Sequence, residues 1–216
     1  MQFSVLAFLY FLTSICSVVL TLYMRKRIRS VVSYTPLLYT MITIIFVSFF
    51  SGLEMIFIDI EIKFLMAKLF YIPFMMHIPC LILFVTSQTE RHGKLNRYVT
   101  YTSLFGSIAF VVVAIINPFN LFHASYTSTV SLGMVLFDAT YGPVFWIFVI
   151  FSYFTICYCT IFLIYKFIKQ KRSRVELALL LLTFWFPLFC NVLYIVRILP
   201  FDLTDRKSTR LNSSHT

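Results

Sequence analysis

The chain has 216 residues, of which 60% are hydrophobic and only 12% are charged, and its formal net charge is +10. Soluble domains carry about 25% charged residues, so this composition excludes an ordinary soluble protein and indicates one integral membrane bundle. The positive charge does not indicate nucleic-acid binding, because the basic residues stand in short blocks between apolar segments. Membrane topology and anionic lipid headgroups account for such blocks, so we expect the lipid bilayer as the main partner.

Six apolar segments are long enough to be membrane helices. A helix rises about 1.5 Å per residue, so about 20 apolar residues cross a hydrocarbon core about 30 Å thick. The predicted spans are residues 3–23, 34–58, 63–87, 98–116, 143–165 and 175–196. We expect Pro73 and Pro79 to interrupt the third span, with kinks that neighbouring helices accommodate.

Lys and Arg predict the orientation of these spans. They gather at residues 25–29, 91–97 and 166–174, directly after the first, third and fifth spans. Such blocks remain on the cytoplasmic side of a membrane. Nothing positive precedes the first span, and its apolar stretch is longer than that of a secretory signal. We therefore expect a retained first helix, an N-terminus outside and the end of the sixth helix outside.

The connection between the fourth and fifth spans, residues 117–142, differs from the basic loops. It contains no Lys or Arg, and Asp138 is its one acid. Ser and Thr residues alternate there with apolar residues, which predicts a short external hairpin or lid.

The last residues do not belong to this pattern. Residues 205–216 include DRKSTRLNSSH, which resembles a common sequencing adapter translated in frame, and polar residues follow the apolar pattern there without turn chemistry. We interpret them as an adapter-like artefact that is not native. Residues 1–204 are then a domain from which the last helix is missing.

Ionisable groups inside a bilayer are costly, and they are candidates for function. Glu54 lies near the outer end of the second span, Lys68 lies about one turn into the third, and Asp59 and Glu61 lie in the turn between them. We expect Glu54 and Lys68 to pair across this turn. Such a pair either fixes the register of the two helices or contacts a small-molecule or lipid ligand.

Three further residues complete the candidate ligand site. His77, between Pro73 and Pro79, is either a hydrogen-bonded packing residue or a group that titrates near neutral pH. Trp146 and Tyr153 are seven residues apart and share a helical face. They either stack on a ligand or belong to the packing and the aromatic belt of the membrane.

Other polar groups give weaker signals. Asn117 and Asn191 are expected to hydrogen-bond between helices. The sequence contains no catalytic set, phosphate loop or metal-ligand spacing, and we expect no catalytic residue, metal or cofactor. The cysteines fall in apolar spans, which favours small packing residues over redox groups: Cys16, Cys80, Cys157, Cys159 and Cys190.

The order of these features resembles the N-terminal seven-transmembrane sensor region of bacterial histidine kinases, which is also fused to diguanylate cyclases. The resemblance covers residues 41–204. It rests on Gly52-Leu53-Glu54, the KLFYIPFMMHIPCLILF helix at 68–84, Asn117-Pro118 followed by Leu121-Phe122-His123, Gly142-Pro143-Val144-Phe145-Trp146 with Ser152-Tyr153, and Pro187, Asn191, Tyr194 and Asp202-Leu203-Thr204. The chain departs from the family at Phe49-Phe50, where Trp is frequent, and at Phe148, where His is frequent.

The resemblance implies an all-α integral membrane fold, here a six-helix fragment of a seven-transmembrane bundle in a bacterial inner or plasma membrane. It implies a sensory input module of a two-component or related signal-transduction system that relays an outer-face stimulus to a missing cytoplasmic effector. That effector is a histidine kinase or a diguanylate cyclase, and the intact protein is expected to be a homodimer. The alternative is a small multi-pass transporter or channel, which predicts inverted repeats and helices broken near the midplane.

Overall fold

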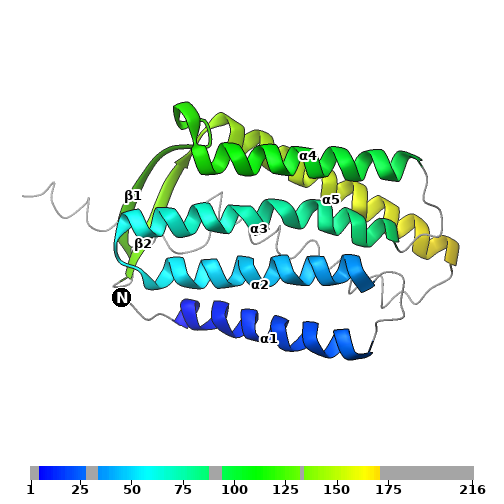
Figure 1. Cartoon of the computed structure of the whole chain (residues 1–216). Coiled ribbons are helices and arrows are strands. Elements are labelled where there is room, and N and C mark those ends of the chain that lie inside the picture. Colours follow the sequence, from blue (N-terminus) through cyan, green and yellow to red (C-terminus); the bar gives the residue numbers. More distant parts are fainter. Residues whose placement is uncertain (1–4, 28–33, 88–93, 132–133, 171–216) are drawn as a thin grey trace, which may run out of the picture.

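The computed structural model describes residues 5–27, 34–87, 94–131 and 134–170. The predicted sixth span and the adapter-like tail lie outside the described residues. Five long helices cover most of the rest: α1 Val5–Arg27, α2 Tyr34–Ile56, α3 Ile60–Ser87, α4 Lys94–Ile116 and α5 Pro143–Gln170 (Figure 1). Each is long and apolar enough to cross a membrane, which agrees with the first five predicted spans.

Four of the described helices are longer than the apolar spans that predicted them, whereas α2 ends at Ile56, two residues before its predicted end. α1 continues to Arg27, α4 begins at Lys94, and α5 continues to Gln170, so basic residues form the last or first turns. Lys and Arg are good helix formers, and water or headgroups can solvate the ends of such helices. α3 is one continuous helix that contains Pro73 and Pro79, so neither proline ends the helix, and a kink at these positions stays a prediction. Both prolines are buried, and packing around α3 holds the helix where backbone hydrogen bonds are lost.

α3 is the central helix of the described bundle. It packs against α2, α4, α5 and both strands, whereas α1 packs against α2 at the edge (Figure 1). The buried core joins Met75 and Ile82 of α3 to Ala114 of α4 and to Phe148 and Leu163 of α5.

A β-hairpin connects α4 to α5, as the alternating sequence predicted. A short 3-10 turn, η1 Pro118–Asn120, leads into β1 His123–Ser131, which pairs antiparallel with β2 Met134–Tyr141. The hairpin lies across the end of the bundle at which α2 ends and α3 begins (Figure 1). We call this end the hairpin end.

The acidic residues and the basic helix ends lie at opposite ends of the bundle, and Lys63 and Lys68 are the two basic residues at the acidic end among those described. The four acidic residues among those described, Glu54, Asp59, Glu61 and Asp138, all belong to the hairpin end. The basic ends of α1, α4 and α5 lie at the opposite end (Figure 1). The segregation that the sequence showed is therefore a property of the folded bundle, and a cytoplasmic location of the basic end stays a prediction.

Candidate functional site

The hairpin is fixed to the bundle at its root by Asn117. The Asn117 Oδ1 accepts hydrogen bonds from the backbone N–H of Phe122 (2.9 Å) and of His123 (3.0 Å). Its Nδ2 donates to the His123 carbonyl oxygen at 2.9 Å. Asn117 has a left-handed backbone conformation, φ 48° and ψ 50°, which Asn tolerates better than most residues. The expected role between helices was therefore wrong, because this side chain holds the entry to β1 instead.

His123 is the most enclosed polar group of the hairpin. Its side chain is 1% exposed, and neither ring nitrogen has a hydrogen-bond partner among the described residues. Five aromatic rings surround it, with ring centroids 5.0 to 6.4 Å away; we call them the aromatic box. They are Phe64, Tyr71, Phe122, Phe137 and Tyr141. Burial lowers the pKa of His123 from 6.5 to about 4, and the nearby Lys68 ammonium acts in the same direction. The imidazole is therefore neutral at pH 7.

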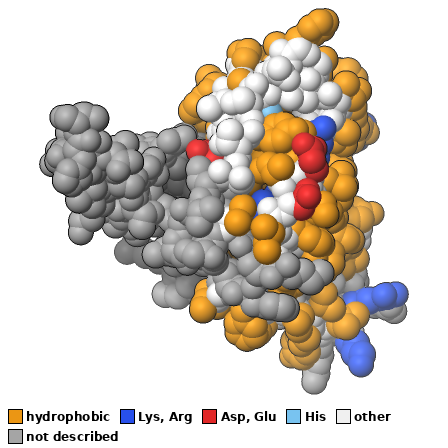
Figure 2. Space-filling view, turned by 90° about the vertical axis from the view of Figure 1, so that its left-hand side faces the viewer, with side chains coloured by type: hydrophobic (Ala, Val, Ile, Leu, Met, Phe, Trp, Pro, Cys, Tyr) orange, Lys and Arg blue, Asp and Glu red, His pale blue; other side chains and the backbone are white. Residues whose placement is uncertain are grey.

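The next residues of the hairpin stack on the first turns of α3. The ring of Tyr126 lies 4.0 Å from that of Phe64, with 14° between their planes. The Tyr126 hydroxyl donates to the Glu61 carboxylate at 3.3 Å. The Lys68 Nζ lies 4.4 Å from the centroid of the Phe64 ring, within the range of a cation–π contact. Figure 2, which faces this end, shows acidic side chains grouped beside hydrophobic ones.

The second strand returns to α5 through a tight junction at Gly142. The Gly142 N–H donates to the Phe122 carbonyl at 2.8 Å, and the Val144 N–H donates to the Leu121 carbonyl at 3.0 Å. A Cβ at Gly142 would overlap the Leu121 carbonyl and lie 2.7 Å from the Asn120 carbonyl oxygen. Both atoms belong to the backbone, so only glycine lets the two ends of the hairpin approach this closely.

Glu54 and Lys68 do not form the pair that the sequence predicted. Lys63 is the electrostatic partner of Glu54, and its Nζ donates to the Glu54 backbone carbonyl oxygen at 2.7 Å. The Lys63 side chain is fully buried, with 0% exposed. The pairing across the α2–α3 turn therefore exists, but it uses the lysine of the first turn of α3, whereas Lys68 faces the hairpin.

His77 lies farther from the hairpin, between α3 and α2. Its Nδ1 is 2.8 Å from the Thr43 Oγ1, and that hydroxyl also donates to the Thr40 carbonyl oxygen. Since the hydroxyl proton points to that carbonyl, the imidazole donates from Nδ1 to Thr43. The hydrogen bond expected of His77 is therefore present, and its part in ligand binding stays a prediction.

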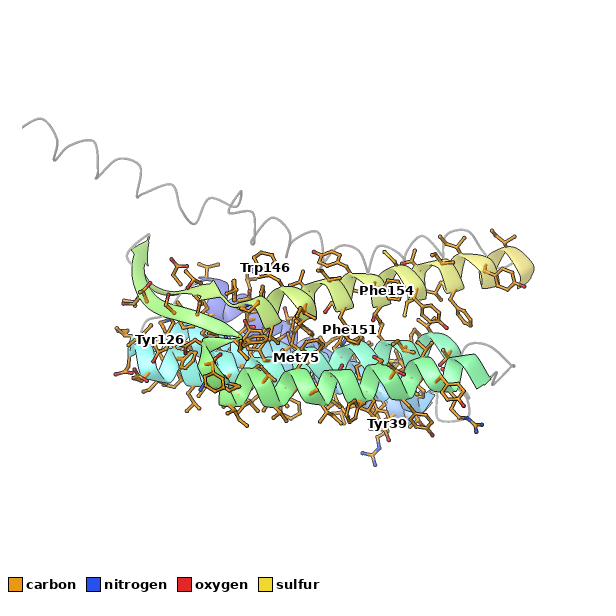
Figure 3. All side chains as sticks on the ribbon, turned by 90° about the horizontal axis from the view of Figure 1, so that it is seen from above. Tyr39, Met75, Tyr126, Trp146, Phe151 and Phe154 are labelled. Carbon is orange, nitrogen blue, oxygen red and sulfur yellow. The ribbon has the colours of Figure 1, made fainter. Side chains whose placement is uncertain are left out.

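Trp146 and Tyr153 lie on α5, away from the aromatic box. Trp146 is 46% exposed in the described part of the chain, and it packs edge-on against Phe145. Figure 3 shows it on the side of α5 that faces away from Met75. The position of Trp146 in the first turn of α5 agrees with an aromatic belt at the membrane surface.

The structure therefore divides the five predicted site residues. Lys68 joins the hairpin contact, Glu54 joins the α2–α3 turn, and His77 has its own partner in Thr43. Sequence reasoning missed His123 as a site residue. Its place after Asn117-Pro118 was visible as part of a motif, but its insertion into the aromatic box depends on how the hairpin folds back onto α3.

Comparisons with known proteins give one family. A family model described as the N-terminal 7TM region of histidine kinase matches residues 9–206. Neither the curated proteins nor the solved structures give a match.

Proposed function

Because the chain belongs to the family of N-terminal seven-transmembrane regions of histidine kinases, we propose that it relays an outer-face stimulus through the membrane to a cytoplasmic effector. The family supplies the sensory input region of histidine kinases and is not catalytic. The proposed effector is a histidine kinase or a diguanylate cyclase, joined through a seventh helix, and the proposed intact protein is a homodimer. Lys68 is the best placed of the five proposed ligand contacts, because it lies under the hairpin.

One observation carries the relay proposal: the hairpin packs on the same stripe of α3 that forms the core. The stripe repeats at intervals of four and three residues, so it stays on one face of the helix. Its members are Phe64, Lys68, Tyr71, Met75, Ile78, Ile82 and Val85. The hairpin covers its beginning, whereas α5 packs on its middle, where Phe74 of α3 also meets Phe148 of α5. A change in hairpin docking therefore has a continuous packed route to α5.

The energetic demand on this relay is modest. A stimulus changes the output only if its affinity differs between two alternative packings of the bundle. The coupling free energy of such a switch is typically about 1–3 kcal/mol. Loss of one aromatic stack such as Tyr126 on Phe64 is of that order, about 0.5–1.5 kcal/mol beyond the area buried. A transporter or channel would favour helices broken near the midplane, and the five described spans are continuous.

The test is to lock the hairpin onto α3 in the intact signalling protein. The double variant Phe64→Cys/Tyr126→Cys is cross-linked with a short bifunctional thiol reagent, and effector output is measured in membranes with and without stimulus. We expect the linked protein to hold one output level. The matched control Ser125→Cys/Thr140→Cys links opposite positions of β1 and β2 and leaves the hairpin free of α3. An unchanged response in the first linked protein would contradict the relay.

A further inference from the structure

We propose that His123 is a proton-binding site, and that its protonation releases the hairpin from α3 when the medium at the hairpin end becomes acidic. This inference rests on the proposed function, because it gives the chemical identity of a stimulus for the same site. It concerns a residue that the candidate ligand site did not include.

The His123 ring lacks polar partners among the described residues. A neutral imidazole has one N–H donor and one acceptor, and an imidazolium has two donors. The His123 ring is 1% exposed, and both of its nitrogens lack partners within the described part of the chain. Edge and tilted contacts with aromatic rings hold the neutral ring. A proton would add a second buried N–H donor and a full positive charge. Neither N–H of the imidazolium would have a hydrogen-bond acceptor among the described residues.

The charged group that acts on the His123 ring is a cation. From α3, Lys68 acts on His123 as a like charge and Tyr71 contributes a neutral ring. From β2, Tyr141 contributes another neutral ring, at 6.0 Å. The Glu61 carboxylate accepts from Tyr126, which lies three residues along β1. The charge that acts on His123 is thus positive, and it opposes protonation while the hairpin is docked.

His123 lies where the hairpin leaves its root. It is the first residue of β1, and the register of the two strands shifts between His123 and Ser125. Asn117 holds the backbone at this point through the Phe122 and His123 amides. Tyr126 and its stack on Phe64 follow immediately. Movement of the His123 ring out of the box therefore moves the strand that carries the Tyr126 stack, while Asn117 keeps the root attached.

The direction of the pH effect follows from linkage. The docked imidazole has a pKa of about 4, whereas an exposed imidazole has a pKa near 6.5, so the released state binds the proton more tightly. Docking is therefore fully favoured above pH 6.5 and weakens as the pH falls from 6.5 towards 4. With these two values the equilibrium for release rises about 25-fold between pH 7.5 and pH 5.

The experiment measures hairpin release directly in the 216-residue chain in membranes. Ala139, on β2 opposite Tyr126, is 8% exposed and is replaced with Cys as the reporter. Thr127→Cys, at an exposed position of the same hairpin, corrects for the pH dependence of thiol chemistry. A membrane-impermeant maleimide is applied between pH 7.5 and pH 5, and mass spectrometry quantifies the peptide that contains each new cysteine. We expect the ratio of the Ala139→Cys rate to the Thr127→Cys rate to rise about 10-fold or more.

Two variants decide whether His123 is the proton site. His123→Phe keeps an aromatic ring without nitrogens, and we expect its labelling ratio to be independent of pH. His123→Leu removes the ring together with its nitrogens, and we expect its labelling ratio to be independent of pH as well. This second variant keeps the inference testable if His123→Phe fails to insert. A flat ratio in the parent chain, or a rise in His123→Phe or His123→Leu equal to that of the parent chain, would overturn the proposal.

The result separates this inference from the relay proposal. Labelling reports release without any effector, so a flat ratio contradicts the proton site alone. An acid-dependent ratio together with unchanged effector output in the intact protein would keep the proton site and contradict the relay.

Discussion

Replacement of Asn117 with Ala should undock the hairpin root. The substitution removes the acceptor of the backbone N–H groups of Phe122 and His123, and it removes the donor to the His123 carbonyl oxygen. Phe122 and His123 are 0% and 1% exposed, so water does not replace these bonds. Each buried amide left unpaired costs about 1–3 kcal/mol. Ala in the left-handed conformation that Asn117 adopts costs about 1 kcal/mol more. We expect Asn117→Ala to weaken hairpin docking by about 3–7 kcal/mol.

The chain offers a matched control in Asn120. This residue also has a positive φ, 56°, but its side chain is exposed, and the described structure gives it no side-chain hydrogen bond. Asn120→Ala therefore carries the backbone cost of about 1 kcal/mol without the loss of the hydrogen bonds. Asn117→Asp keeps the acceptor and loses the donor, so we expect an intermediate effect.

Hydrogen exchange of the β1 and β2 amides in lipid nanodiscs measures the difference. The free energy of hairpin docking should differ by about 2 kcal/mol or more between Asn117→Ala and Asn120→Ala. This difference corresponds to hairpin amides that exchange about 30-fold faster in Asn117→Ala. The amides of α3 serve as the internal reference, because their exchange should change little. Equal protection of the hairpin in the two variants would refute the assignment of Asn117 as the residue that holds the root.

Three further predictions concern the same end of the bundle. Gly142→Ala should lower the protection of the hairpin amides from hydrogen exchange by about 2 kcal/mol or more, because its Cβ would overlap the backbone at 120–121. Helix content by circular dichroism should stay constant, and unchanged protection of the hairpin amides would contradict this prediction. Lys63→Met should lower the free energy of unfolding by about 3 kcal/mol, because it leaves Glu54 without its charge partner. Adding Glu54→Gln should recover part of the loss, and strict additivity in thermal unfolding would argue against the pair. Phe119→Asn should stabilise the chain by about 1 kcal/mol, since Phe119 is 95% exposed at φ 53°; a loss in melting temperature would show that the ring is anchored.

The helices and the hairpin were predictable because their signals are local. Apolar length predicted the five described spans, and alternation of Ser and Thr with apolar residues predicted the hairpin at 117–142. The boundaries were less accurate, because basic residues such as those at 25–27 continue a helix beyond the apolar segment. Such ends depend on helix propensity and headgroups, whereas the apolar count depends on the hydrocarbon core alone.

The site was less predictable because its contacts depend on the path of the chain. Asn117 was expected between helices, yet its side chain binds the backbone of Phe122 and His123, a contact that forms only when the hairpin folds back. His123 is polar and stands in a Ser-rich loop, so its sequence environment predicts exposure. Burial comes from rings that α3 and β2 bring together, and Phe64 and Phe137 are 73 positions apart in the sequence. No local pattern in a single sequence encodes such a meeting.

Glu54 has Lys63 as its partner instead of the predicted Lys68 because of where α3 begins. α3 begins at Ile60, three residues before the predicted start, so Lys63 occupies its first turn beside the end of α2. Five residues along a helix turn the direction of a side chain by about 140°, so Lys63 and Lys68 cannot face the same neighbour. One lysine joins α3 to α2, and the other faces the hairpin and acts on His123. The first turns of α3 are therefore held on one side by α2 and on the other by the hairpin. Release of the hairpin would remove the second of these two contacts and keep the one with α2, which favours a tilt of α3 about that attachment as the movement that reaches α5.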